Sequence, residues 1–93
     1  MIRSFRCQDT ARIWSGIPVR KFPSDIHQRA LNKLRLLDAA LTVNDLRNPP
    51  GNRPEALRGE RKGEYSIRVT DQWRICFKWN AGDVTDVEIV DYH

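Results

Sequence analysis

Apolar residues recur at helical spacing in the first half of the chain and at every second position in the second half. Ser24, just after Pro23, is a good N-cap for a helix. One apolar face follows it at helical spacing, formed by Ile26, Ala30, Leu31, Leu34, Leu37 and Leu41. This pattern predicts an amphipathic helix whose leucines are core residues. A shorter helix is predicted from a cap at Asp9 or Thr10 through Trp14.

Three segments of the second half, 64–69, 73–79 and 84–91, have the period-2 alternation of strands. Turns are predicted at 70–72 and 80–83, a short edge strand at 2–7, and a loop at the proline-rich segment 48–54. A capping-box variant at Thr42–Asp45 predicts one more helical turn, through Arg47. Helices first and an antiparallel meander second predict an α+β fold, with the N-terminal helices packed on one face of a small antiparallel sheet.

The composition bounds the class of protein. Ninety-three residues predict a single domain, 1–93, and 40% hydrophobic with 30% charged residues is typical of a soluble globular protein. No apolar run approaches the roughly 20 residues that span a bilayer, and the first residues lack the apolar region of a secretory signal. Cys7 and Cys76 do not suggest a disulfide framework, and Cys76 is expected to be a small buried hydrophobe. We expect a cytoplasmic protein without contact to membranes.

The net charge of +4 is unevenly distributed, because all 16 Lys and Arg precede residue 79 and four acids follow it. A basic body rich in Arg predicts a polyanionic partner such as nucleic acid, although a solubilising surface is the alternative. If the aromatic face of strand 73–79 is buried under the helices, Arg68, Arg74 and Lys78 project from the opposite, open face. That face could hold a phosphodiester, or the Arg stems could simply cover a solvated sheet.

The chain ends in three proton-transfer side chains, Asp91-Tyr92-His93, which are either functional or a solvated tail. His27 is expected to be a surface or packing histidine. No metal-ligand spacing, nucleophile elbow or dinucleotide fingerprint is present, so an enzyme would be metal-free and cofactor-free. Cleavage of RNA suits such residues, because the 2′-hydroxyl is an internal nucleophile and the protein need supply only a base, an acid and cations.

An ordered set of motifs resembles the HigB-type killer proteins, a branch of the RelE superfamily of bacterial toxin–antitoxin systems. The motifs are Met1–Phe5, Pro50–Arg53, Leu57–Gly59, Gly63–Arg68, Gln72–Phe77 and Asp91–His93. The resemblance implies a microbial-ribonuclease-like domain that enters the ribosomal A site and cuts translated mRNA. It also implies neutralisation by a helix-turn-helix antitoxin, with operator DNA bound only through the complex.

The resemblance also implies roles for individual residues. Arg74 corresponds to the arginine that stabilises the cleavage transition state, Arg58 to a phosphate contact, and Asp91, Tyr92 and His93 to the C-terminal catalytic cluster. His93 would transfer the proton, Tyr92 would stack on a base or help move a proton, and Asp91 would orient His93.

Further contacts to RNA are expected from Arg68, which would grip a phosphate, and from Lys78. Glu55 stands where some relatives carry a histidine. The alternatives are a non-enzymatic RNA- or ribosome-binding inhibitor and a transcriptional co-repressor.

Overall fold

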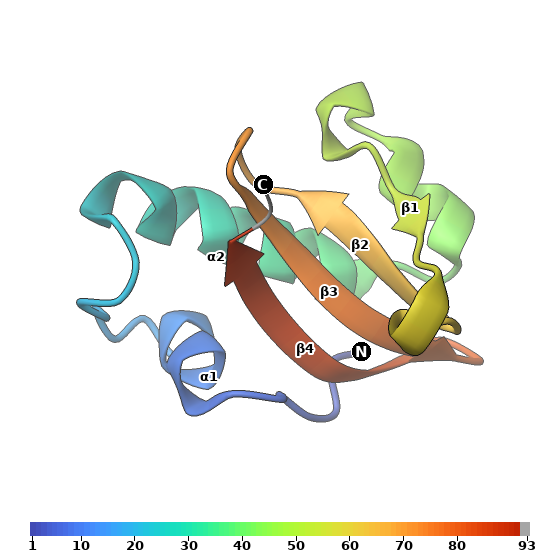
Figure 1. Ribbon diagram of the computed structural model, residues 1–93, viewed down its shortest axis with the longest axis horizontal. Coiled ribbons are helices and arrows are strands. Elements are labelled where there is room, and N and C mark those ends of the chain that lie inside the picture. The colour runs from blue at the N-terminus through green and yellow to red at the C-terminus, as the bar shows by residue number, and fades with distance from the viewer. Residues whose placement is uncertain (92–93) are drawn as a thin grey trace.

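The computed structural model describes residues 1–91; Tyr92 and His93 lie outside the described residues. Two α-helices, α1 (Gln8–Trp14) and α2 (Ser24–Ala39), precede a sheet of β1 (Glu55–Ala56), β2 (Glu64–Arg68), β3 (Trp73–Asn80) and β4 (Asp83–Asp91). Three short 3-10 turns, η1 (Val43–Arg47), η2 (Pro50–Asn52) and η3 (Gly59–Arg61), lie between α2 and β2. The strands are antiparallel in the order β1-β2-β3-β4, and the helices cover one face (Figure 1). The predicted α+β architecture is confirmed.

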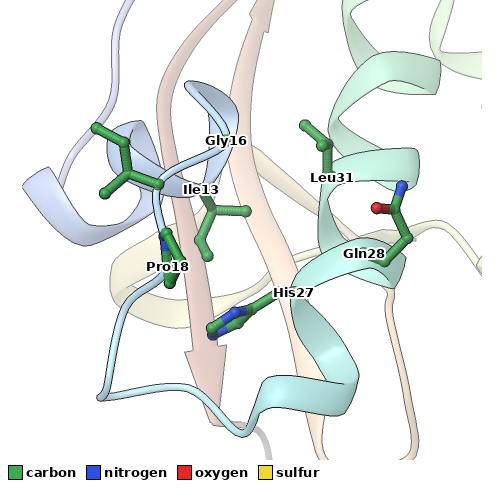
Figure 2. A pocket seen from close by; sticks show the side chains of 7 residues that line it. Ile13, Gly16, Pro18, His27, Gln28 and Leu31 are labelled. Atoms are coloured by element: carbon green, nitrogen blue, oxygen red, sulfur yellow. The ribbon is translucent and has the colours of Figure 1, made fainter.

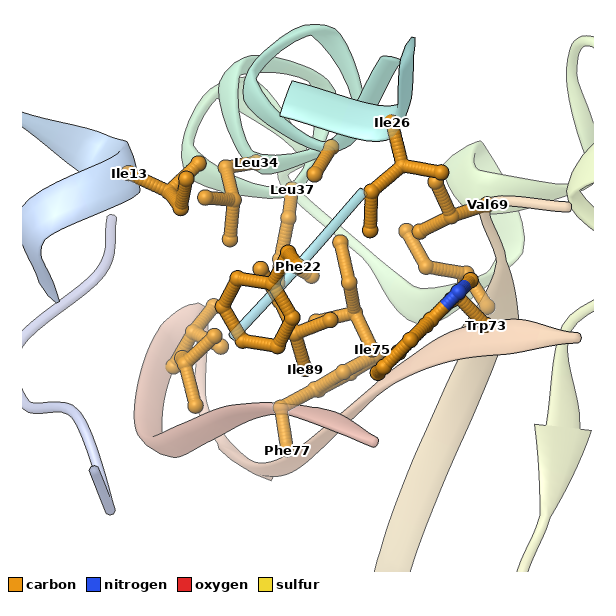
Figure 3. Close-up of a cluster of buried hydrophobic side chains, with 14 of the residues drawn as sticks. Ile13, Phe22, Ile26, Leu34, Leu37, Val69, Trp73, Ile75, Phe77 and Ile89 are labelled. Atoms are coloured by element: carbon orange, nitrogen blue, oxygen red, sulfur yellow. The ribbon is translucent and has the colours of Figure 1, made fainter. Parts of the chain in front are cut away.

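The core lies between α2 and the helix-facing side of the sheet, as Figure 3 shows. Ile26, Leu34 and Leu37 of α2 are buried, because the helical period places them on one face. Ile75 and Phe77 rise from β3 to meet them. The ring of Phe22 contacts the ring of Trp73 edge-on, with centroids 5.3 Å apart and planes at 87°.

Helix α2 ends earlier than its apolar pattern suggests, so the prediction that Leu41 is a core residue is wrong. Ala40 already has extended backbone, and Leu41 is 82% exposed. The carboxylate of Asp45 accepts hydrogen bonds from the backbone N–H of Leu41 (2.9 Å) and Thr42 (3.1 Å). The sequence predicted this capping box. It starts η1, and α2 therefore ends before Leu41. The prediction of Ser24 as N-cap is also wrong by one position, because Ser24 is the first helical residue and Pro23 is the N-cap.

The edge of β4 is covered by the N-terminal segment and by α1. The predicted strand 2–7 forms only two isolated parallel bridges, Ile2 with Val84 and Phe5 with Val87. The pairing of β3 with β4 is irregular between Cys76 and Lys78. The hydroxyl of Thr10, which is fully buried in α1, accepts a hydrogen bond from the backbone N–H of Ile89 at 3.0 Å. Over residues 1–91, neither helix is long and apolar enough to cross a membrane.

Candidate functional site on the outer face of the sheet

We call the side of the sheet that faces away from α1 and α2 the outer face. Cross-strand pairing places Arg68 opposite Arg74 and Ser66 opposite Cys76. These side chains share the outer face, as the alternation predicted. The expectation that this face is open is wrong at its centre, because Arg74 is only 7% exposed and both Ser66 and Cys76 are fully buried. Burial raises the pKa of the Cys76 thiol, which fits the predicted role as a small buried hydrophobe.

Three hydrogen bonds to Ser66 and Arg53 orient the guanidinium of Arg74. Its Nε donates to the hydroxyl of Ser66 at 2.9 Å, and its Nη2 donates to the carbonyl oxygen of Ser66 at 3.3 Å. The same Nη2 donates to the carbonyl oxygen of Arg53, which approaches from the loop before β1. These three acceptors are neutral oxygens, so the bonds to them orient the side chain without neutralising its positive charge.

A second guanidinium, that of Arg68, lies opposite Arg74 at this end of the sheet, and the ammonium of Lys33 lies near Arg68. The guanidinium of Arg68 pairs with the carboxylate of Asp71, which is 97% exposed. Burial, and then the nearby positive charge of Arg68, lower the pKa of Lys33 on α2. The ammonium of Lys33 donates to the side-chain oxygen of Asn52, a fully buried residue. We call Arg68 and Arg74 the cationic end of the outer face, which Lys33 approaches from α2.

The opposite end of the outer face holds a network of ion pairs. The carboxylate of Glu64 lies 3.3 Å from Arg6 and 3.4 Å from Arg61, and Glu88 lies 3.0 Å from Arg61. Lys78 joins this region, with its ammonium 3.2 Å from the carboxylate of Asp86. Since β3 rises about 3.4 Å per residue, four residues separate Lys78 from Arg74 by about 14 Å.

Of the other predicted site residues, Glu55 and Arg58 lie near opposite ends of the outer face. Glu55 is exposed on β1 directly opposite Ser66, and so it lies beside the cationic end. Arg58 is exposed just before η3 and lies toward the ion-pair end, since Leu57 is hydrogen-bonded to Glu64. Asp91 pairs with Trp73, so alternation places its side chain on the helix-facing side of the sheet and not beside Arg74, and its carboxylate accepts a hydrogen bond from the side chain of Gln72 at 3.1 Å. The predicted roles of Tyr92 and His93 lie outside the described residues.

Three residues that support Arg74 were not singled out as functional from the sequence: Ser66, Asn52 and Lys33. The strand alternation did carry a signal for Ser66, because it places this serine on the same face as Arg74 on the neighbouring strand. Asn52 and the carbonyl of Arg53 left no such signal. Their contacts arise from the path of a loop, which has no period.

His27 lies at a cavity of about 140 Å³ between α1 and α2, lined by Ile13, Gly16, Ile17, Pro18, Gln28 and Leu31 as well (Figure 2). Its Nε2 lies 3.0 Å from the carbonyl oxygen of Val19 and 3.1 Å from that of Phe22. Both acceptors are carbonyls, so Nε2 carries the proton and donates. This half-buried histidine ties the interhelical loop to α2, which confirms its predicted packing role.

Comparison of the fold with solved structures finds bacterial toxins. The chain aligns with the YoeB–YefM toxin–antitoxin complex from Staphylococcus aureus with a TM-score of 0.63 and 14% identity, covering 100% of this chain and 98% of the other. It aligns with a mutant of YafQ from Escherichia coli with a TM-score of 0.61 and 17% identity, covering 98% of this chain and 91% of the other. At these identities the likeness shows the fold.

Comparison of sequences points to one branch of these toxins. Toxin HigB-1 of Vibrio cholerae is 51% identical over 63 residues, which span 68% of this chain and 66% of that protein. Endoribonuclease HigB of Proteus vulgaris is 29% identical over 93 residues, the full length of both chains. Residues 3–93 match the family described as RelE-like toxin of type II toxin–antitoxin system HigB. The chain therefore belongs to the HigB-like family of RelE-like toxins from type II toxin–antitoxin systems.

Proposed function

We propose that this protein is a ribosome-dependent endoribonuclease that cleaves mRNA in the ribosomal A site and so inhibits growth. The observation that carries the proposal is the guanidinium of Arg74, held by hydrogen bonds to Ser66 and Arg53 on the outer face of the sheet. A cation fixed before substrate binds can stabilise developing negative charge without reorganising during the reaction. The name of the Proteus vulgaris relative supports the same class of activity.

The proposed reaction is attack of an mRNA 2′-hydroxyl on the adjacent phosphate, with departure of the 5′-oxygen of the next nucleotide. This chemistry needs no metal ion, because the nucleophile is already in place and cations of the chain stabilise the charge. Arg74 stabilises the transition state, and Arg68, its cross-strand partner, grips a phosphate. His93 transfers the proton, Asp91 orients His93, and Tyr92 stacks on a base or helps to move a proton.

The remaining predicted residues would contact RNA farther from the cleaved bond. Arg58 is exposed, so its guanidinium is available for a phosphate. Glu55 lies close enough to the cationic end to contact the nucleotide held there. Lys78 already pairs with Asp86, so we assign it a weaker phosphate contact near the ion-pair end.

Two kinds of partner follow from this function. The ribosome positions the mRNA, and cleavage of naked RNA is therefore expected to be feeble. A helix-turn-helix antitoxin neutralises the protein, and operator DNA is bound only through that complex. Membership of a type II toxin–antitoxin family supports an antitoxin partner. We place this activity in the cytoplasm, where translation occurs.

A single 2′-deoxynucleotide tests the proposed nucleophile. In a translating ribosome complex, an mRNA with 2′-deoxyribose on the 5′ side of the cleaved bond is expected to resist cleavage at that bond, because the attacking hydroxyl is absent. The same substitution three nucleotides upstream is the matched control and should leave cleavage unchanged. Products would be resolved by primer extension. Undiminished cleavage at the modified nucleotide would contradict 2′-hydroxyl attack.

A further inference from the structure

The carbonyl of Arg53 reaches Arg74 from outside the sheet. It bonds Nη2, while the two Ser66 acceptors belong to the neighbouring strand. Arg53 has left-handed backbone, with φ of 40° and ψ of 62°, which L side chains adopt rarely. Such a conformation persists only where the surroundings maintain it. The position of this carbonyl therefore depends on whatever holds the loop just before Arg53.

Asn52 is the residue that holds this loop. It is fully buried, and its Nδ2 donates to the carbonyl oxygens of Leu46 (3.1 Å) and Asn48 (3.2 Å). Its Oδ1 accepts from the ammonium of Lys33. One planar amide thus joins η1, the following loop and α2. An amide is suited to this position because it supplies two donors and an acceptor from the same group.

The backbone transmits this anchoring to Arg53. The N–H of Asn52 donates to the carbonyl of Pro49 at 3.0 Å, and the N–H of Arg53 donates to that of Pro50 at 3.2 Å. Residues 49–53 therefore form one hydrogen-bonded turn with a buried side chain near its end. Removing that side chain would release the turn, and the Arg53 carbonyl with it.

We propose that Asn52 is a positioning residue for Arg74, which it orients through the backbone carbonyl of Arg53. This inference rests on the proposed function, since it names a residue that serves the cleavage site without touching RNA. Lys33 completes the arrangement by holding Oδ1 from α2, so the helix side of the fold sets the orientation of a cation on the outer face.

Kinetics of mRNA cleavage in a translating ribosome complex separate positioning from binding. Asn52→Ala and Asn52→Asp are expected to lower the maximal cleavage rate about 10-fold, with the half-saturating protein concentration changed less than about two-fold, because misplacement of a catalytic group affects the chemical step. Asn52→Asp keeps an acceptor for Lys33 but has no donor for Leu46 or Asn48. Thr10→Val is the matched control, since it also removes a buried hydrogen bond, to Ile89, and should keep the wild-type rate.

A double-mutant cycle identifies the route. If Asn52 acts through Arg74, then Asn52→Ala should cause no further loss in an Arg74→Ala background. An additional loss as large as that in the wild-type background would overturn the proposal. So would a rate loss in Thr10→Val equal to that in the Asn52 variants.

Side-chain NMR of Arg74 tests the inference without relying on cleavage. A guanidinium held at Nη2 rotates slowly about its Nε–Cζ bond and gives separate Nη signals. These are expected in the wild type and in Thr10→Val, and they should merge in Asn52→Asp. Separate signals that persist in Asn52→Asp would refute positioning by Asn52. A wild type that shows these signals but cuts no mRNA would instead refute the proposed function alone.

Discussion

Arg74→Ala is expected to lower the maximal rate of mRNA cleavage about 10²- to 10³-fold, the usual effect of removing one preorganised charge-stabilising group. Arg74 carries the only guanidinium among residues 1–91 that bonds both Ser66 and the Arg53 carbonyl. Its replacement removes a cation whose orientation is set before RNA binds. Arg74→Lys should recover only part of the rate, because an ammonium lacks the planar fork of donors that contacts acceptors from two segments at once.

The measurement is single-turnover cleavage on translating ribosomes, with co-sedimentation to monitor ribosome binding. Arg12→Ala is the matched control, because Arg12 pairs with Asp9 on the surface of α1 and should retain the wild-type rate. Thermal melting of each variant separates loss of chemistry from loss of fold. Wild-type cleavage by a folded Arg74→Ala variant would remove Arg74 from the mechanism.

His93→Ala is expected to lower the cleavage rate about 10²- to 10⁴-fold, the range for loss of a general acid or base. Imidazole can both accept and donate a proton near neutral pH, which the arginines of the site cannot do. Asp91 pairs with Trp73, so strand alternation directs its side chain to the helix-facing side of the sheet, opposite to that of Arg74, and the assignment of His93 rests on this proton-transfer chemistry.

The other histidine of the chain, His27, provides the control for this variant. His27→Gln keeps an N–H donor for the carbonyls of Val19 and Phe22, and it should leave cleavage unchanged. Rates would be measured as for Arg74, with ribosome binding followed in parallel. If His93→Ala cuts as fast as the wild type and the His27→Gln control, proton transfer must be assigned to another residue.

The sheet could be predicted because its strands show a local alternation of apolar and polar residues. Alternation in 64–69 and 73–79 assigns each side chain to a face, and the observed pairing of Arg68 with Arg74 keeps that assignment. The strand β1 escaped prediction because two residues, Glu55 and Ala56, are too few to show a period. Leu41 continues the helical spacing of α2, yet the capping box at Thr42 ends that helix first.

The candidate site was only partly predictable, for a different reason. The sequence predicts which side chains lie on the outer face. It does not predict how exposed those side chains are, because other segments of the chain cover parts of this face. Arg74 is buried because the Arg53 carbonyl reaches it, and Glu64 because Arg6 and Arg61 enclose it. The contacts of Arg74 with Arg53 and of Glu64 with Arg6 join residues at least 21 positions apart, so no local pattern in the sequence records these two contacts.

Mapping of mRNA ends tests the central claim most directly. Primer extension would be carried out on mRNA from a translation extract with and without the protein, beside the same transcript free of ribosomes. The account predicts new ends within codons in translated mRNA, and few or none in the ribosome-free transcript. Blocked translation without new ends would contradict it and indicate inhibition by occupancy of the ribosome. Comparable cleavage of the free transcript would contradict its dependence on the ribosome.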